Sequence, residues 1–178
     1  MTHKSHMLLA LEQARMSPPC PPKFCVGAVL VDGDTNDVLA SGYYQEFARG
    51  SRGPEDPGTI HAEHACLIKL AQKHGIPETD LGSVLPPNAV FYTTMEPCSE
   101  RSEGRTCVDR ILQLGDGRAI KAMYVGVRKP DAVGESKGVC RLEEAGVQVV
   151  WMDDDHELRE QILEITCAGH SSRGGDNG

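Results

Sequence analysis

Two short segments contain side chains that bind soft divalent metals. The first is "HAEH", in which Glu63 follows His61 by two residues, and the second is "EPCSERSEGRTC", in which eight residues separate Cys98 from Cys107. One imidazole and two thiolates leave the fourth position of tetrahedral Zn²⁺ open, as a catalytic site requires, and zinc lowers the pKa of a bound water to about 7. The pattern therefore predicts a Zn²⁺ site made by His61, Cys98 and Cys107, with Glu63 as the catalytic residue that moves protons.

Other interpretations of the same residues remain open. A structural zinc site normally has four protein ligands, and Glu63 would then have no role. An enzyme that used Cys98 as a nucleophile would be sensitive to alkylation and insensitive to chelation. The remaining histidines and cysteines are expected to be packing, capping or surface residues, with His3 and His6 in solvent. Capping or surface positions are expected for His64 and His74, and small buried positions for Cys66, Cys140 and Cys167.

Apolar periodicity and turn residues predict the elements that position this site. We expect helices over residues 3–16, 61–75, 106–115, 139–146 and 153–167, and strands over 26–31, 38–44, 89–95, 121–127 and 147–152. Residues 45–59 have no periodicity and are expected to form a long loop. Helices that alternate with five short strands predict a three-layer α/β domain. Because ligands gather where strands end and helices begin, His61 and the two cysteines are expected to converge.

Composition narrows the class of protein. The chain has 178 residues, which is enough for one domain over residues 1–168, and the polar end, residues 169–178, is expected to be a disordered tail. The net charge of −8 argues against nucleic-acid binding, which needs cationic cover for phosphates. No segment resembles a membrane span or a secretory signal, so we expect a cytoplasmic protein with no membrane partner. Seven cysteines, an odd number, favour metal or catalytic roles over disulfides in such a compartment.

The two metal-binding segments together resemble the H-x-E … P-C-x-n-C signature of the zinc-dependent cytidine-deaminase superfamily. The long gap between the cysteines resembles the riboflavin-pathway pyrimidine deaminases, which have the pattern E-P-C-S-H-x-G-R-T-P-P-C. "VGAVLV" and residues 127–149 resemble further segments of that family, so the similarity covers residues 7–150. The resemblance implies a three-layer α/β/α fold with a five-stranded mixed sheet and helices on both faces. It also implies a homodimer or a larger homo-oligomer.

The resemblance further implies a substrate. Bacterial members of the family carry a reductase domain after the deaminase, and we expect this chain to have no room for one and to resemble the fungal members. Their implied reaction converts 2,5-diamino-6-ribitylamino-4(3H)-pyrimidinone 5′-phosphate to 5-amino-6-ribitylamino-uracil 5′-phosphate and ammonia. Arg101 and Arg105, beside the cysteine segment, and Lys23 are candidates for binding the phosphate. Tyr44, at a position where the family usually has histidine, is a further candidate for substrate binding.

Three alternative functions compete with this one. The first two are a deaminase of cytidine- or deoxycytidylate-type nucleotides and a deaminase of a transfer-RNA base. The third is a non-catalytic, zinc-stabilised partner subunit that keeps the fold. The acidic charge argues against RNA, and the complete set of His61, Glu63, Cys98 and Cys107 argues against a non-catalytic subunit.

Overall fold

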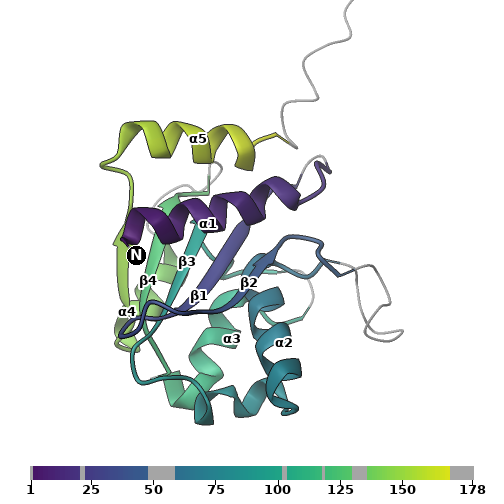
Figure 1. The fold of residues 1–178 in the computed structure, drawn as a ribbon, viewed down its shortest axis with the longest axis vertical. Helices are drawn as coiled ribbons and strands as arrows, with labels where there is room; N and C mark the ends of the chain where they lie inside the picture. Colours follow the sequence, from purple (N-terminus) through teal and green to yellow (C-terminus); the bar gives the residue numbers. More distant parts are fainter. Residues whose placement is uncertain are drawn as a thin grey trace, which may run out of the picture.

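The fold is a five-stranded sheet between two layers of helices, as a computed structural model shows (Figure 1). The structure describes residues 2–20, 23–47, 59–101, 104–117, 119–129 and 136–168. The predicted tail, residues 169–178, and most of the predicted loop, residues 48–58, lie outside the described residues.

The helices cover both faces of the sheet. Helices α1 (His3–Met16) and α5 (His156–Thr166) lie on one face. On the other face lie α2 (Ala62–His74), α3 (Cys107–Gln113) and α4 (Lys137–Glu144), together with the short 3₁₀ helices η1 (Glu78–Ser83) and η2 (Leu114–Gly117). The predicted three-layer α/β/α fold is confirmed, and the 3₁₀ helices were not predicted.

The strands run in the order β2-β1-β3-β4-β5. Their bounds are β1 Gly27–Asp32, β2 Val38–Tyr43, β3 Ala89–Met95, β4 Ile120–Val127 and β5 Gln148–Trp151. Strand β1 pairs antiparallel with β2 and β3, whereas β3–β4 and β4–β5 are parallel, so the predicted mixed sheet is confirmed. All seven residues of β3 are buried, as expected for a central strand covered on both sides.

Each face of the sheet has its own hydrophobic core. The core under α2, α3 and α4 is built around Phe91, Leu67 and Met123, and the core under α1 and α5 around Met7, Leu11 and Leu158. Within the described residues, no helix combines the length and the apolar character that a membrane crossing needs.

Local signals set the ends of the helices. Gly75, at φ 64°, ends α2 in the left-handed conformation that glycine adopts without strain. Thr106 and Asp109 form a reciprocal capping box at the start of α3. Asp155 caps α5 through a hydrogen bond to the Leu158 amide, so that helix begins three residues later than predicted.

A glycine on β2 allows α2 to approach the sheet closely. A Cβ atom added at Gly42 would lie 2.7 Å from the carbonyl oxygen of Ala62 and 2.7 Å from the Cβ of Ala65. Such distances are shorter than van der Waals contact, so only glycine fits at this position. The first turn of α2 is therefore held directly against the sheet.

Candidate active site

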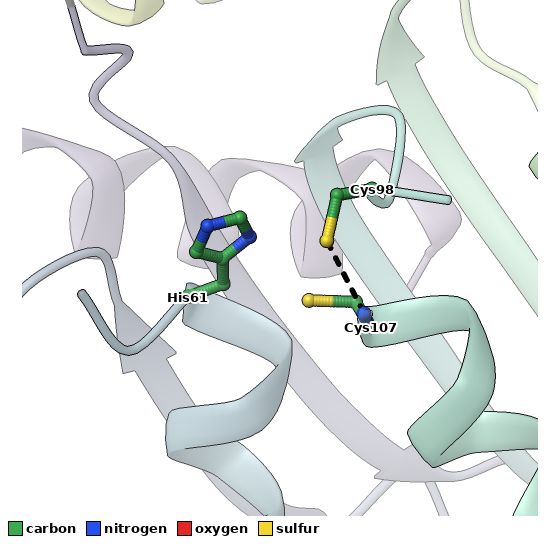
Figure 2. Close-up of side chains that lie close together, drawn as sticks. All are labelled: His61, Cys98 and Cys107. Atoms are coloured by element: carbon green, nitrogen blue, oxygen red, sulfur yellow. Dashed lines mark hydrogen bonds between the residues drawn. The ribbon is translucent and has the colours of Figure 1, made fainter. Parts of the chain in front are cut away.

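Three potential metal ligands converge at one end of the sheet. The ligand atoms of His61, Cys98 and Cys107 all lie within 4.8 Å of one another. Figure 2 shows that His61 immediately precedes α2, that Cys98 lies in the turn after β3, and that Cys107 is the first residue of α3. The structure thus brings together the three side chains singled out in the sequence, and we call them the ligand cluster.

Hydrogen bonds within the ligand cluster prepare it for a cation. The Cys98 sulfur accepts a hydrogen bond from the Cys107 backbone N–H at 3.2 Å, drawn as the dashed line in Figure 2. A hydrogen bond from the Cys107 thiol and the nearby His61 lower the pKa of Cys98 to about 4. The same thiol bond and burial raise the pKa of Cys107. Cys98 is therefore favoured as a thiolate. Cys107 keeps its proton until a cation binds and displaces it.

The ligand cluster fits Zn²⁺ by the chemistry of its donors. One imidazole nitrogen and two sulfurs are ligands that zinc prefers. Among the described residues, the group has three members, and Glu63 is not one of them. Three protein ligands are the number typical of catalytic zinc sites.

The carboxyl group of Glu63 lies directly beside the ligand cluster. Glu63 is in the first turn of α2, and only 3% of its surface is exposed. Its Oε2 is 3.4 Å from the Cys107 sulfur, and its Oε1 accepts a hydrogen bond from the Thr93 hydroxyl at 3.2 Å. Burial raises the pKa of this carboxyl, which favours its protonated form. A group of this kind is suited to accept and return a proton.

Two of the predicted substrate-binding residues contact the segments that carry the ligand cluster. The ring of Tyr44, which is 5% exposed, meets the His61 ring edge-on at a centroid distance of 5.7 Å. Arg101 donates from Nη2 to both the carbonyl oxygen and the hydroxyl of Thr59, at 3.2 and 3.1 Å. Arg101 therefore connects the cysteine segment to the chain just before His61.

The other two candidates lie farther out. Arg105 is exposed and donates to the side-chain oxygen of Gln113 on α3 at 2.7 Å. Lys23 is also exposed, and its backbone N–H donates to the Cys20 carbonyl oxygen. The structure thus separates the four candidates into an inner pair, Tyr44 and Arg101, and an outer pair.

Two histidines differ from their predicted surroundings. His64 is 7% exposed, and its Nε2 lies 2.8 Å from Glu78 Oε2, which also contacts Arg110 of α3. This partly buried group connects α2 to α3 through η1. His6, predicted to be in solvent, is 1% exposed and packs on the Tyr92 ring, because α1 turns it toward the sheet.

Sequence reasoning also missed Thr93. It is fully buried on β3 and contacts Glu63. A hydroxyl in a strand that is expected to be buried on both faces was the available signal, because a buried polar group needs a partner.

The family to which the chain belongs follows from a comparison with known proteins. The model of the family described as "Cytidine and deoxycytidylate deaminase zinc-binding region" matches residues 1–123. The chain belongs to this family, and its fold and the place of the ligand cluster agree with that assignment.

Within the family, the chain is similar to riboflavin-pathway deaminases. It is 31% identical to the diaminohydroxyphosphoribosylamino-pyrimidine deaminase of Schizosaccharomyces pombe over 94% of this chain and 36% of that protein. It is 28% identical to the riboflavin biosynthesis protein RibD of Bacillus amyloliquefaciens over 92% of this chain and 38% of that protein. The chain thus spans little more than a third of the length of these curated relatives.

A solved structure matches over nearly the whole of both chains. The Rib2 deaminase of Aspergillus oryzae, a C-terminal deletion mutant, is 38% identical, with a TM-score of 0.75 over 96% of this chain and 94% of that one. A further structure of that mutant is a complex with DARIPP.

Proposed function

We propose that this protein is a zinc-dependent aminohydrolase of the riboflavin pathway. Its reaction converts 2,5-diamino-6-ribitylamino-4(3H)-pyrimidinone 5′-phosphate to 5-amino-6-ribitylamino-uracil 5′-phosphate and ammonia. The observation that carries the proposal is the ligand cluster with the Glu63 carboxyl against it. The names of the S. pombe and Bacillus relatives and the DARIPP complex of the A. oryzae deaminase support this choice of substrate.

His61, Cys98 and Cys107 would hold the zinc ion. When bound there, zinc supplies a Lewis acid that makes water acidic enough to react near neutral pH. The backbone N–H of Cys107 continues to donate to the Cys98 sulfur and fixes its orientation.

Glu63 moves the protons of the reaction. Water adds to the ring carbon that bears the 2-amino group, and Glu63 accepts a proton from that water. Glu63 gives that proton to the neighbouring ring nitrogen, then takes the remaining proton of the added hydroxyl and passes it to the departing amine, which leaves as ammonia while the ring carbon becomes a carbonyl. Its buried position, 3.4 Å from the Cys107 sulfur, keeps the carboxyl close to the reacting atoms and away from bulk water.

The phosphate of the substrate needs positive charge or N–H donors. Arg101 uses only Nη2 in its bonds to Thr59, so its other guanidinium N–H groups can bind phosphate next to the ligand cluster. Arg105 and Lys23 are outer candidates that would act on a longer substrate tail. Tyr44 lies against His61 and would limit the space beside the pyrimidine ring.

The proposal is tested by measuring ammonia release from the zinc-loaded protein. We expect release from the diamino-ribitylamino-pyrimidinone phosphate, and slower or no release from deoxycytidylate and cytidine. The family description makes these two compounds the appropriate competitors. A preference for deoxycytidylate would replace the proposed substrate, and no release from any of the three would contradict the proposal as a whole.

Phosphate binding is tested with two variants. Arg101→Ala is expected to raise KM for the phosphorylated substrate several-fold more than KM for its dephosphorylated analogue. Arg105→Ala should have the same selectivity with a smaller effect, because that side chain is exposed and bonded to Gln113. Equal effects on both substrates would remove the phosphate assignment.

A further inference from the structure

The Thr93 hydroxyl contacts two oxygens that compete for its hydrogen. Its Oγ1 is 3.2 Å from Glu63 Oε1 and 2.9 Å from the carbonyl oxygen of Met95. A hydroxyl has one hydrogen and two acceptor sites, so it donates to only one of these oxygens at a time. Through these two contacts the hydroxyl links the Glu63 carboxyl to the backbone of β3.

The place of this hydroxyl in the molecule is fixed. Thr93 is fully buried in the central strand, paired with Ala28 on one side and with Val125 on the other. A β-branched side chain in a strand has few χ1 rotamers, which fixes the direction of its oxygen. Glu63, by contrast, has a longer side chain with three rotatable bonds. Thr93 is therefore the rigid member of the pair.

The two oxygens of the Glu63 carboxyl have different neighbours. Oε1 meets Thr93, and Oε2 faces the Cys107 sulfur of the ligand cluster. We propose that Thr93 is a positioning residue for Glu63, whose hydroxyl holds Oε1 so that Oε2 faces the reacting atoms. The inference rests on the proposed function, because it assigns Glu63 the transfer of protons. An error of about 1 Å in the position of such a group can cost on the order of 100-fold in rate.

The test compares three variants of the zinc-loaded protein. Thr93→Val keeps the shape and removes the hydroxyl, and Thr93→Ser restores the hydroxyl. Thr94→Val is the matched control, because Thr94 is equally buried on the same strand and its hydroxyl accepts from the Gly27 amide instead.

We expect Thr93→Val to lower kcat about 10- to 100-fold with little change in KM. Thr93→Ser should recover most of the lost rate, while Thr94→Val should lose stability and keep kcat. Zinc content should be the same in all variants.

A second measurement does not depend on turnover. Crystal structures of parent and Thr93→Val should show the Glu63 carboxyl rotated away from the Cys107 side in the variant. If Thr93→Val does not fold, Thr93→Ala against Thr93→Ser gives the same comparison. An unchanged carboxyl in the variant, or a parental kcat, would overturn the positioning role. A parent protein that releases no ammonia would instead contradict the proposed function, and the carboxyl position would then decide the role of Thr93 by itself.

Discussion

Polar groups on the two faces of the sheet have different partners. On the face under α2 and α3, the Thr93 hydroxyl and the Glu63 carboxyl lead to the ligand cluster. On the face under α1, the Tyr92 hydroxyl bonds to His3 Nδ1 at 2.8 Å, and Tyr124 bonds to the other nitrogen of the same ring at 3.2 Å. The Tyr92 and Tyr124 rings also stack, with centroids 4.9 Å apart.

This difference separates a reactive polar group from a structural one. The partners of His3 form a closed set, in which each ring nitrogen has one tyrosine hydroxyl. The ligand cluster instead gathers two sulfurs and an imidazole, next to a carboxyl whose pKa is raised by burial. Polar groups that pair with one another in hydrogen bonds stabilise a fold. Metal-ligand atoms that converge with too few hydrogens to pair fully instead prepare a site for a cation and a substrate.

The largest effect is expected at Glu63. Glu63→Gln keeps the size of the side chain and removes its ability to carry a proton, so kcat should fall by roughly 10²- to 10⁴-fold. Metal analysis should show the parental zinc content, because Glu63 is not in the ligand cluster. Parental turnover by this variant would show that the carboxyl on this face is structural, like the polar groups on the other face.

Metal removal should affect activity about as strongly as the loss of the Glu63 carboxylate. Chelation is expected to remove most of the activity and to lower the Tm, because folding brings the three expected zinc ligands together from separate segments, and readdition should restore both. Saturation to about 100 times Kd would stabilise the fold by about 2.7 kcal/mol. Cys98→Ser should weaken the response to zinc, and Cys140→Ser, a cysteine outside the ligand cluster, serves as the matched control. Identical zinc responses in both variants would argue against Cys98 as a ligand.

A substitution on the face under α1 should change the stability of the protein and leave its activity unchanged. Tyr92→Phe removes the hydroxyl that bonds to His3, which should lower the free energy of unfolding by about 0.5–1.5 kcal/mol. The kcat of the folded variant should equal that of the parent. The two measurements are a kcat determination and a urea unfolding curve for each protein. A large fall in kcat would mean that the two faces are coupled through β3.

The smallest effect on stability is expected at the N-terminal cap of α3, the helix that begins with Cys107. Hydrogen bonds from the Arg141 side chain and from Thr106 lower the pKa of Asp109. A lowered folded-state pKa contributes stability above the unfolded value, near 3.9, and this contribution disappears as pH falls through the folded pKa. Asp109→Asn should therefore be less stable than the parent at pH 7, by under about 1 kcal/mol, and no less stable at the acid end. A pH-independent difference would contradict the assignment.

The sequence predicted the features that depend on rare residues in short segments. Cys98 follows the clearly marked apolar run "AVFYTTM", and His61 and Cys107 stand at the starts of predicted helices, so both their convergence and the five strands could be predicted. The partners of Thr93 and His64 could not. Thr93 meets Glu63 only through the packing of α2 on the sheet, and His64 meets Glu78 through a 3₁₀ turn that has too few residues to show a periodic pattern. Contacts of this kind are set by tertiary packing and leave no local pattern.

The close approach at Gly42 limits how this molecule can be redesigned. A single added methyl group there would push against Ala62 and Ala65, and the displaced helix would take both His61 and Glu63 with it. Directed evolution toward a new pyrimidine should therefore tolerate changes at exposed positions such as Val84, while position 42 remains glycine in every active descendant.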